Sequence, residues 1–124
     1  MGGTDRSPPT TSPLAAAALD HVLLSYAYLD DGDLDGYGSL LADDARLIRP
    51  GQPNIIGRDQ ILAELARTAG PPRRHRLYRV IAHDDHIIAR GRCTHEDVDF
   101  VDVVTFSADG LLCGQRRYYA TAEA

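Results

Sequence analysis

The first half of the chain carries apolar residues at the three- and four-residue steps of a helix. Over residues 14–31 this spacing predicts a helix with one buried face, and Gly32 would end it. Its apolar positions are Leu19, Val22, Leu23, Tyr26 and Leu29. A second, short helix is predicted after Asp33, which suits an N-cap, and a third over residues 58–69.

The second half changes to a period of two, which indicates strands. Strands are predicted at residues 45–48, 76–82, 87–94, 99–106 and 111–120. Three helices followed by an antiparallel meander indicate an α+β domain. We expect the helices to cover one face of a strongly curved antiparallel sheet, as a cone-shaped barrel enclosing an apolar pocket.

Composition and charge narrow the class of protein. The chain has 124 residues, 44% of them hydrophobic, which fits one globular domain. Its net charge of −5 argues against binding to nucleic acid or anionic lipid. Residues 1–13 predict a disordered tail, 14–121 the folded domain and 122–124 a frayed end. No membrane span or signal peptide is evident, so a cytoplasmic location is expected.

Strand pairing assigns an inner face to the sheet. With turns at residues 96–97 and 107–110, Asp102 opposes Gly91 and Gln115. The inner face is then Ala89, Gly91, Cys93, His95, Phe100, Asp102, Val104, Phe106, Cys113, Gln115, Arg117 and Tyr119. A slip of one residue would exchange the two faces.

The two cysteines and the histidine-rich turn do not predict a metal site. Cys93 and Cys113 would lie about 10 Å apart across an intervening strand at ~4.8 Å spacing, so both should be free thiols. The run His83-Asp84-Asp85-His86 lies on a tight turn whose side chains point apart, and no third ligand converges on it. We expect neither a metal nor another cofactor.

Several motifs, taken in order, resemble a known family. They are Tyr26-Ala27-Tyr28-Leu29-Asp30-Asp31-Gly32-Asp33-Leu34, Leu41-Ala42-Asp43-Asp44-Ala45, Gly57-Arg58-Asp59-Gln60-Ile61 and Arg74-His75-Arg76. Over residues 15–121 they resemble the SnoaL-like branch of the nuclear transport factor 2-like superfamily, which includes ketosteroid isomerases, scytalone dehydratase and polyketide cyclases. The resemblance implies a conical α+β barrel with an apolar pocket, dimeric through its sheet.

The resemblance also assigns positions. The isomerase base falls on Arg49, which cannot abstract a proton at neutral pH, and the isomerase oxyanion-hole aspartic acid falls on Asp102. The scytalone dehydratase pattern fits better: its helix-borne aspartate matches Asp30, its first histidine His75 and its second His95.

Asp30, His75, His95 and Asp102 are therefore candidates for acid–base catalysis. The alternatives are a frayed helix end at Asp30, exposed histidines, and a structural ion pair between Asp102 and an arginine. Arg49 and Arg117 are candidates to hold an enolate, carboxylate or phenolate. The other expected substrate-binding residues are Tyr26, Phe100, Gln115 and Tyr119.

Together these observations predict a cofactor-independent enzyme that cyclises, dehydrates or isomerises an apolar, oxygenated, polyketide-like molecule, as in antibiotic biosynthesis. A histidine would move the proton, Asp30 would orient it, and Arg49 or Asp102 would stabilise the oxyanion. Two alternatives stay open. One is epoxide opening with Asp30, Asp102 and Arg49, and the other is a non-catalytic small-molecule-binding protein.

Overall fold

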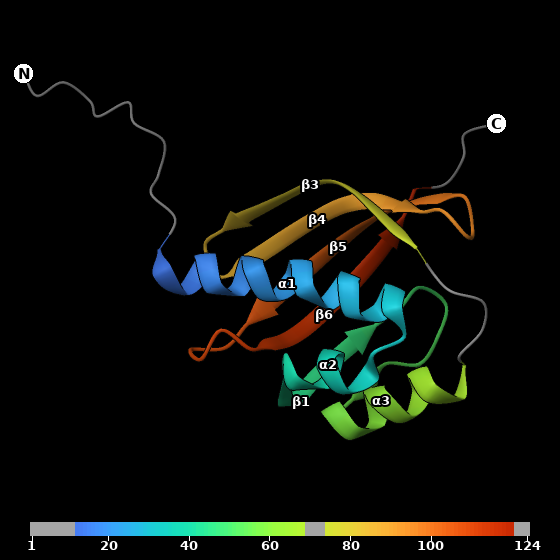
Figure 1. Ribbon diagram of the computed structural model, residues 1–124, viewed down its shortest axis with the longest axis horizontal. Helices are drawn as coiled ribbons and strands as arrows, with labels where there is room; N and C mark the ends of the chain where they lie inside the picture. Colours follow the sequence, from blue (N-terminus) through green and yellow to red (C-terminus); the bar gives the residue numbers. More distant parts are fainter. Residues whose placement is uncertain (1–11, 69–73, 121–124) are drawn as a thin grey trace, which may run out of the picture.

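The computed structural model describes residues 12–68 and 74–120, which form three helices on one face of a six-stranded sheet (Figure 1). The helices are α1 (Pro13–Asp31), α2 (Leu34–Ser39) and α3 (Arg58–Arg67). The strands are β1 (Leu41–Ile48), β2 (Ile55–Ile56), β3 (His75–His83), β4 (His86–Cys93), β5 (Val98–Phe106) and β6 (Leu112–Tyr119). The predicted α+β architecture is confirmed.

The sheet differs from the prediction at its β1 side. The strand order is β2-β1-β6-β5-β4-β3, and β1 runs parallel to β6 while the other neighbours are antiparallel. β1 is longer than the predicted strand 45–48 because it begins almost where α2 ends, pairing Leu41 with Leu112. The edge strands β2 and β3 do not pair with each other, so the described sheet is open.

Both predicted hairpin registers are displaced by two residues. Asp102 pairs with Ala89 and Arg117. The connection between β4 and β5 is wider than a two-residue turn, since residues 94–97 all lie outside the strands. A displacement by two residues preserves the alternation of side chains, so Asp102 and Arg117 keep their predicted inner face.

The predicted inner-face position of Cys113 is wrong. The ladder between β5 and β6 shifts between Thr105 and Phe106, and this irregularity leaves Cys113 unpaired. The sulfur of Cys113 lies 3.5 Å from the Thr105 hydroxyl, on the outer face. Cys93 stays buried at the inner face, and both cysteines are free thiols as predicted.

The ends of α1 are set by short-range chemistry. The Ser12 hydroxyl accepts a hydrogen bond from the first turn and Pro13 begins the helix. Gly32 takes a left-handed φ of 73° and ends it. Ser12 and Pro13, predicted as tail, thus belong to the helix end; the remainder of the predicted tail, 1–11, and the predicted frayed end, 122–124, lie outside the described residues.

The core lies between the helices and the inner face of the sheet. Val22 and Tyr26 of α1 pack with Tyr37 of α2, Ile61 of α3 and Phe100 of β5. None of the helices in residues 12–68 and 74–120 has the length and apolar content needed to cross a bilayer.

Candidate active site

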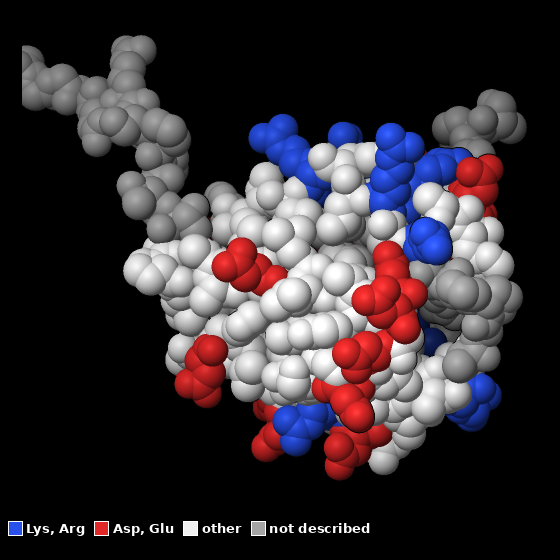
Figure 2. All heavy atoms as spheres, in the orientation of Figure 1, with Lys and Arg blue, Asp and Glu red and all other residues white. Residues whose placement is uncertain are grey.

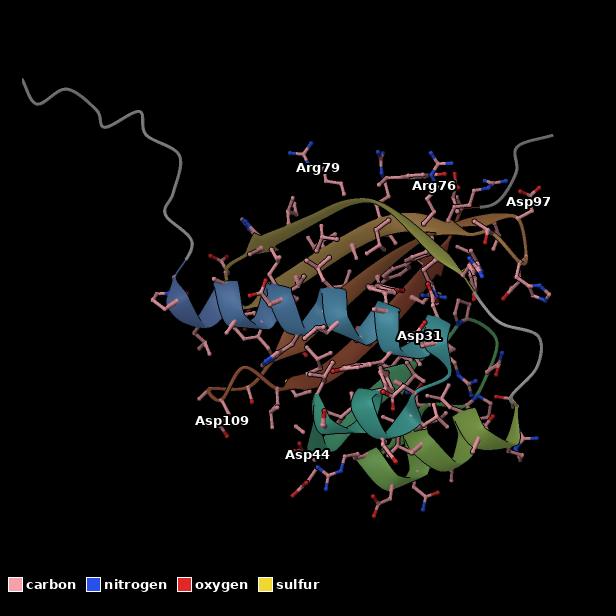
Figure 3. All side chains as sticks on the ribbon, in the orientation of Figure 1. Asp31, Asp44, Arg76, Arg79, Asp97 and Asp109 are labelled. Carbon is pink, nitrogen blue, oxygen red and sulfur yellow. The ribbon has the colours of Figure 1, made fainter. Side chains whose placement is uncertain are left out.

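Asp30, in the last turn of α1, and His75, the first residue of β3, form a nearly buried pair. Nδ1 of His75 lies 2.6 Å from Oδ1 of Asp30, and the backbone N–H of His75 donates to Oδ2 at 3.0 Å. The His75 side chain is only 5% exposed. α1 remains helical through Asp31, which lies at its end in Figure 3, so the helix does not fray at Asp30.

The pair defines which nitrogen of the imidazole is available. A carboxylate can only accept hydrogen bonds, so Nδ1 of His75 holds the proton that it shares with Asp30. Nε2 is then the acceptor in the neutral ring, and it makes no hydrogen bond within the part of the chain that the structure describes. The last turn of α1 has no basic residue, so a positively charged imidazolium would offset both Asp30 and the negative helix end.

Aromatic rings surround the imidazole. Its centroid is 5.1 Å from the ring of Tyr26 and 5.7 Å from that of Phe100, which it meets edge to face. The adjacent Arg76 points away from the helices in Figure 3, as strand alternation requires. His75 therefore faces the apolar space between α1 and the sheet.

Asp102, in the middle of β5, is fully buried and accepts hydrogen bonds from three side chains. Arg117 donates Nε to Oδ1 at 2.8 Å and Nη2 to Oδ2 at 2.7 Å. The Tyr26 hydroxyl donates to Oδ2 at 2.5 Å, and the Gln115 amide donates to the same oxygen at 3.0 Å. Of the interpretations left open for Asp102, an ion pair with Arg117 is present.

Burial determines the charge states around this ion pair. Burial raises the pKa of Tyr26 above its usual range, and the Asp102 carboxylate raises it further. Burial raises the pKa of Tyr37 to about 12 and also raises the pKa of the Cys93 thiol. Burial alone would lower the pKa of Arg117, but the hydrogen bonds with Asp102, the negative charge of Asp102 and smaller contributions from Cys93 and Tyr119 together outweigh this and raise the pKa. One ion pair thus lies among neutral groups.

Arg49, directly after β1, does not contact Asp102. Its Nη2 lies 3.6 Å from Oε2 of Glu64 in α3, and its Nε is buried without a hydrogen-bond partner among the residues that the structure describes. Sequence reasoning missed Glu64, although it lies three residues after the buried Ile61 and hence on a neighbouring part of the same helix face.

Two predicted site residues lie at or beyond the edge of this cluster. His95 was predicted on the inner face, but β4 ends at Cys93 and His95 is exposed in the turn that follows. It makes no hydrogen bond or ion pair with residues 12–68 or 74–120 in the structure. Tyr119 is 39% exposed, with the Arg117 guanidinium 5.8 Å from its ring.

The other polar clusters offer less for chemistry. In the turn between β3 and β4, His83 pairs with Asp84 and His86 with Asp85, all of them solvated. Among the described residues, no group of three or more His, Cys, Asp and Glu side chains could hold a metal ion. A shallow surface hollow is lined by Asn54, Ile55, Ile56, Gln60, Ala63, Glu64 and Arg67. None of the predicted site residues lines that hollow.

The geometry suits proton transfer. An imidazole oriented by a carboxylate can act as a general base, as the pair of His75 and Asp30 is arranged to do.

Comparison with known proteins agrees with this fold. Residues 22–114 match the model of the SnoaL-like domain. An NTF-2 like protein of unknown function from Burkholderia xenovorans LB400 is 18% identical, with a TM-score of 0.78 and 91% of each chain covered. An M. tuberculosis LEH-like epoxide hydrolase is 21% identical, with a TM-score of 0.72, 87% of this chain and 86% of that chain covered.

Bal32a, from a soil-derived mobile gene cassette, is 23% identical, with a TM-score of 0.74, 86% of this chain and 91% of that chain covered. A search of curated proteins found no match. The solved structures share the fold, and the match over residues 22–114 shows the family: the chain belongs to the SnoaL-like domain family.

Proposed function

We propose that this protein is a cofactor-independent acid–base enzyme that cyclises, dehydrates or isomerises an apolar, oxygenated, polyketide-like molecule. The single observation that carries the proposal is the pair of His75 and Asp30, in which a 5% exposed imidazole is held by a carboxylate at 2.6 Å. Nε2 of His75 has no hydrogen-bond partner among residues 12–68 and 74–120, which leaves it free to accept a proton.

The proposed step is a proton relay through Nε2 of His75. Nε2 removes a proton from a carbon next to a substrate carbonyl, and the electron pair moves onto the carbonyl oxygen as an enolate. Asp30 stabilises the imidazolium through Nδ1. The imidazolium then returns the proton to another substrate atom, or to a leaving hydroxyl group that departs as water.

Asp102 acts in this scheme as a positioning residue. Both of its oxygens already accept hydrogen bonds, from Arg117, Tyr26 and Gln115. Tyr26 in turn lies against the His75 ring. Asp102 therefore orients Tyr26, which contacts the imidazole. The same occupied oxygens disfavour epoxide opening, which would need a second carboxylate able to take a proton.

The test is exchange of substrate protons for deuterium. Binders are first selected by thermal shift from a panel of bicyclic and tricyclic ketones that includes 2-tetralone. Loss of the proton signal next to the carbonyl in D2O is then followed by NMR. We expect His75→Gln and Asp30→Asn each to reduce the enzymatic exchange rate at least ~100-fold while the fold, checked by circular dichroism, is retained.

The matched control is His86→Gln. His86 also pairs with an aspartate, Asp85, at 2.7 Å, but its side chain is 41% exposed. The His86→Gln variant should exchange substrate protons at the wild-type rate. Binding with no exchange in the wild type would instead support the non-catalytic alternative, and equal exchange in wild type and His75→Gln would remove His75 from the mechanism.

We also propose that the protein forms a homodimer through the outer face of its sheet. Ile81 and Tyr118, both on this face, are 39% and 52% exposed. Arg79 and Arg90 are opposite each other in the ladder between β3 and β4, and Figure 2 shows arginine side chains along the β3 edge, so this charged edge would lie at the rim of the interface and the apolar side chains at its centre. Light scattering should give a dimer mass for the wild type, and a monomer for Tyr118→Asp if this face is the interface.

A further inference from the structure

Arg49 lies beside the ion pair of Asp102 and Arg117 without taking part in it. Ile48, the last residue of β1, pairs with Arg116 in the parallel ladder between β1 and β6, so Arg49 follows the end of this ladder at the level of Arg117. Leu47 is buried and strand alternation turns Arg49 to the same, inner face. The contact with Glu64 of α3, on the helix side of the sheet, agrees with this direction.

The guanidinium of Arg49 has more donors than partners. It makes no hydrogen bond with the described residues, and its nearest acidic oxygen, on Glu64, is 3.6 Å away. Both oxygens of Glu64 already accept hydrogen bonds from Arg67, at 3.0 and 2.8 Å. Nε of Arg49 is shielded from solvent and has no partner, which is an unfavourable state for a donor.

Arg117 differs in this respect. Its Nε and Nη2 both donate to Asp102, and its Nη1 donates to Cys93. Of the two arginines that could hold an anionic group, Arg117 has its donors taken by Asp102 and Cys93, whereas Arg49 has the 3.6 Å ion pair with Glu64 and an Nε that no described residue accepts from. The Arg117 guanidinium also lies 4.2 Å from the Phe100 ring, and Phe100 contacts His75. Arg117, Phe100 and His75 thus follow one another along the inner face of the sheet, and Arg49 lies at the Arg117 end of this row.

We propose that Arg49 binds a carboxylate group of the substrate, so that the molecule processed by this site is an apolar carboxylic acid. Nε and one Nη nitrogen would donate two parallel hydrogen bonds to the two carboxylate oxygens, an arrangement that guanidinium geometry favours. The inference rests on the proposed function for the identity of the reacting end, whereas the carboxylate site itself depends only on Arg49.

The test compares 2-naphthoate with its neutral analogue 2-naphthamide by isothermal titration calorimetry on the full chain. The wild type should bind the carboxylate ~10–100-fold more tightly. Arg49→Gln should remove this preference, and Arg49→Lys should restore part of it as a point charge. Arg46→Gln is the matched control and should leave the preference unchanged. Arg46 lies three residues before Arg49 in the chain, and its exposed side chain is on the outer face of the sheet, where the ladder pairs it with Gly114.

Equal affinity for the two compounds in the wild type, no binding of naphthoate at millimolar concentration, or a preference that survives Arg49→Gln would each overturn the proposal. Should Arg49→Gln unfold, the wild-type comparison still decides. Failure of the proposed function is distinguishable: a naphthoate preference in the wild type that is lost in Arg49→Gln supports the Arg49 site even where no proton exchange is ever detected.

Discussion

At the scale of single residues, the buried carboxylate of Asp102 is the group on which we expect stability to depend most. It is 0% exposed, and among the described residues its one ion-pair partner is Arg117. Removing one partner of a buried ion pair leaves the other charge desolvated, which costs more than the pair contributes. The inner face therefore depends on both residues being present.

Replacing Asp102 with Asn keeps its shape and removes its charge. We expect Asp102→Asn to lower the free energy of unfolding by about 3–5 kcal/mol, measured by urea denaturation. Asp99→Asn on the same strand removes a half-exposed partner of Arg92 and should cost less than about 1 kcal/mol. Equal costs for the two variants would contradict the interpretation that burial makes the Asp102 pair critical.

At the scale of elements, the close approach of β3 to its neighbours places His75 against Phe100. Gly91 of β4 makes this approach possible, because a Cβ there would lie 2.4 Å from the Arg76 carbonyl oxygen and 3.1 Å from the Phe100 ring. The backbone of β3 would have to move to accommodate even a methyl group, and His75 begins that strand.

Gly91→Ala should accordingly reduce both stability and proton exchange. We expect about 1–3 kcal/mol of destabilisation in urea, from overpacking against backbone, together with a slower exchange rate. The control is Gly114→Ala, whose Cβ would meet the Thr105 hydroxyl at 2.7 Å. That side chain can rotate, so the cost should be smaller and exchange should stay at the wild-type rate. If Gly91→Ala kept the wild-type stability and exchange rate, β3 would be able to shift freely, which would contradict this prediction.

At the scale of the whole molecule, folding keeps Tyr26 and Tyr37 protonated. Their pKa values are raised in the folded state, that of Tyr37 to about 12. In the unfolded chain a tyrosine ionises near pH ~10. This contribution to stability is therefore complete below pH ~10 and is lost as the pH rises from there, because only the unfolded chain releases these protons.

Alkaline unfolding should follow from this. Between pH ~10 and ~11 we expect the free energy of unfolding to fall by up to ~1.4 kcal/mol per pH unit for each of the two tyrosines. Part of the phenolate absorbance at 295 nm should appear only together with loss of the circular dichroism signal. Tyr37→Phe should make the loss of stability less steep. Complete ionisation of all tyrosines while the protein stays folded would contradict this prediction.

Much of the fold could be predicted because it depends on local periodicity. The three- and four-residue spacing of apolar residues located α1, and alternation located the strands from β3 onward. The inner-face membership of Phe100, Asp102 and Arg117 survived a register error, because an error of two residues leaves each side chain on its face. Asp30 and His75 could be named as candidates from motif resemblance, whereas their distance could not.

The wrong predictions share one cause: they concern turn length, bulges and strand order, which the local pattern of apolar and polar residues does not determine. A wider turn after Cys93 removed His95 from the inner face, and a bulge moved Cys113 to the outer one. β1 pairs in parallel with β6 because the edge of β6 is open to it in the folded sheet. The spacing of residues in the sequence does not encode which strand edge is open.

The sequence by itself determined the elements, the faces of the strands and the residue types available for acid–base chemistry, since helical and strand spacing are properties of neighbouring positions. Only the tertiary structure decided the partners. In the fold Asp30 binds His75 and Asp102 binds Arg117 rather than Arg49, while Nε of Arg49 has no acceptor in the described part of the chain. Such pairings depend on strand order, turn length and the packing of helices on the sheet. These features bring residues that are far apart in the chain close together, where they compete for the same buried partners.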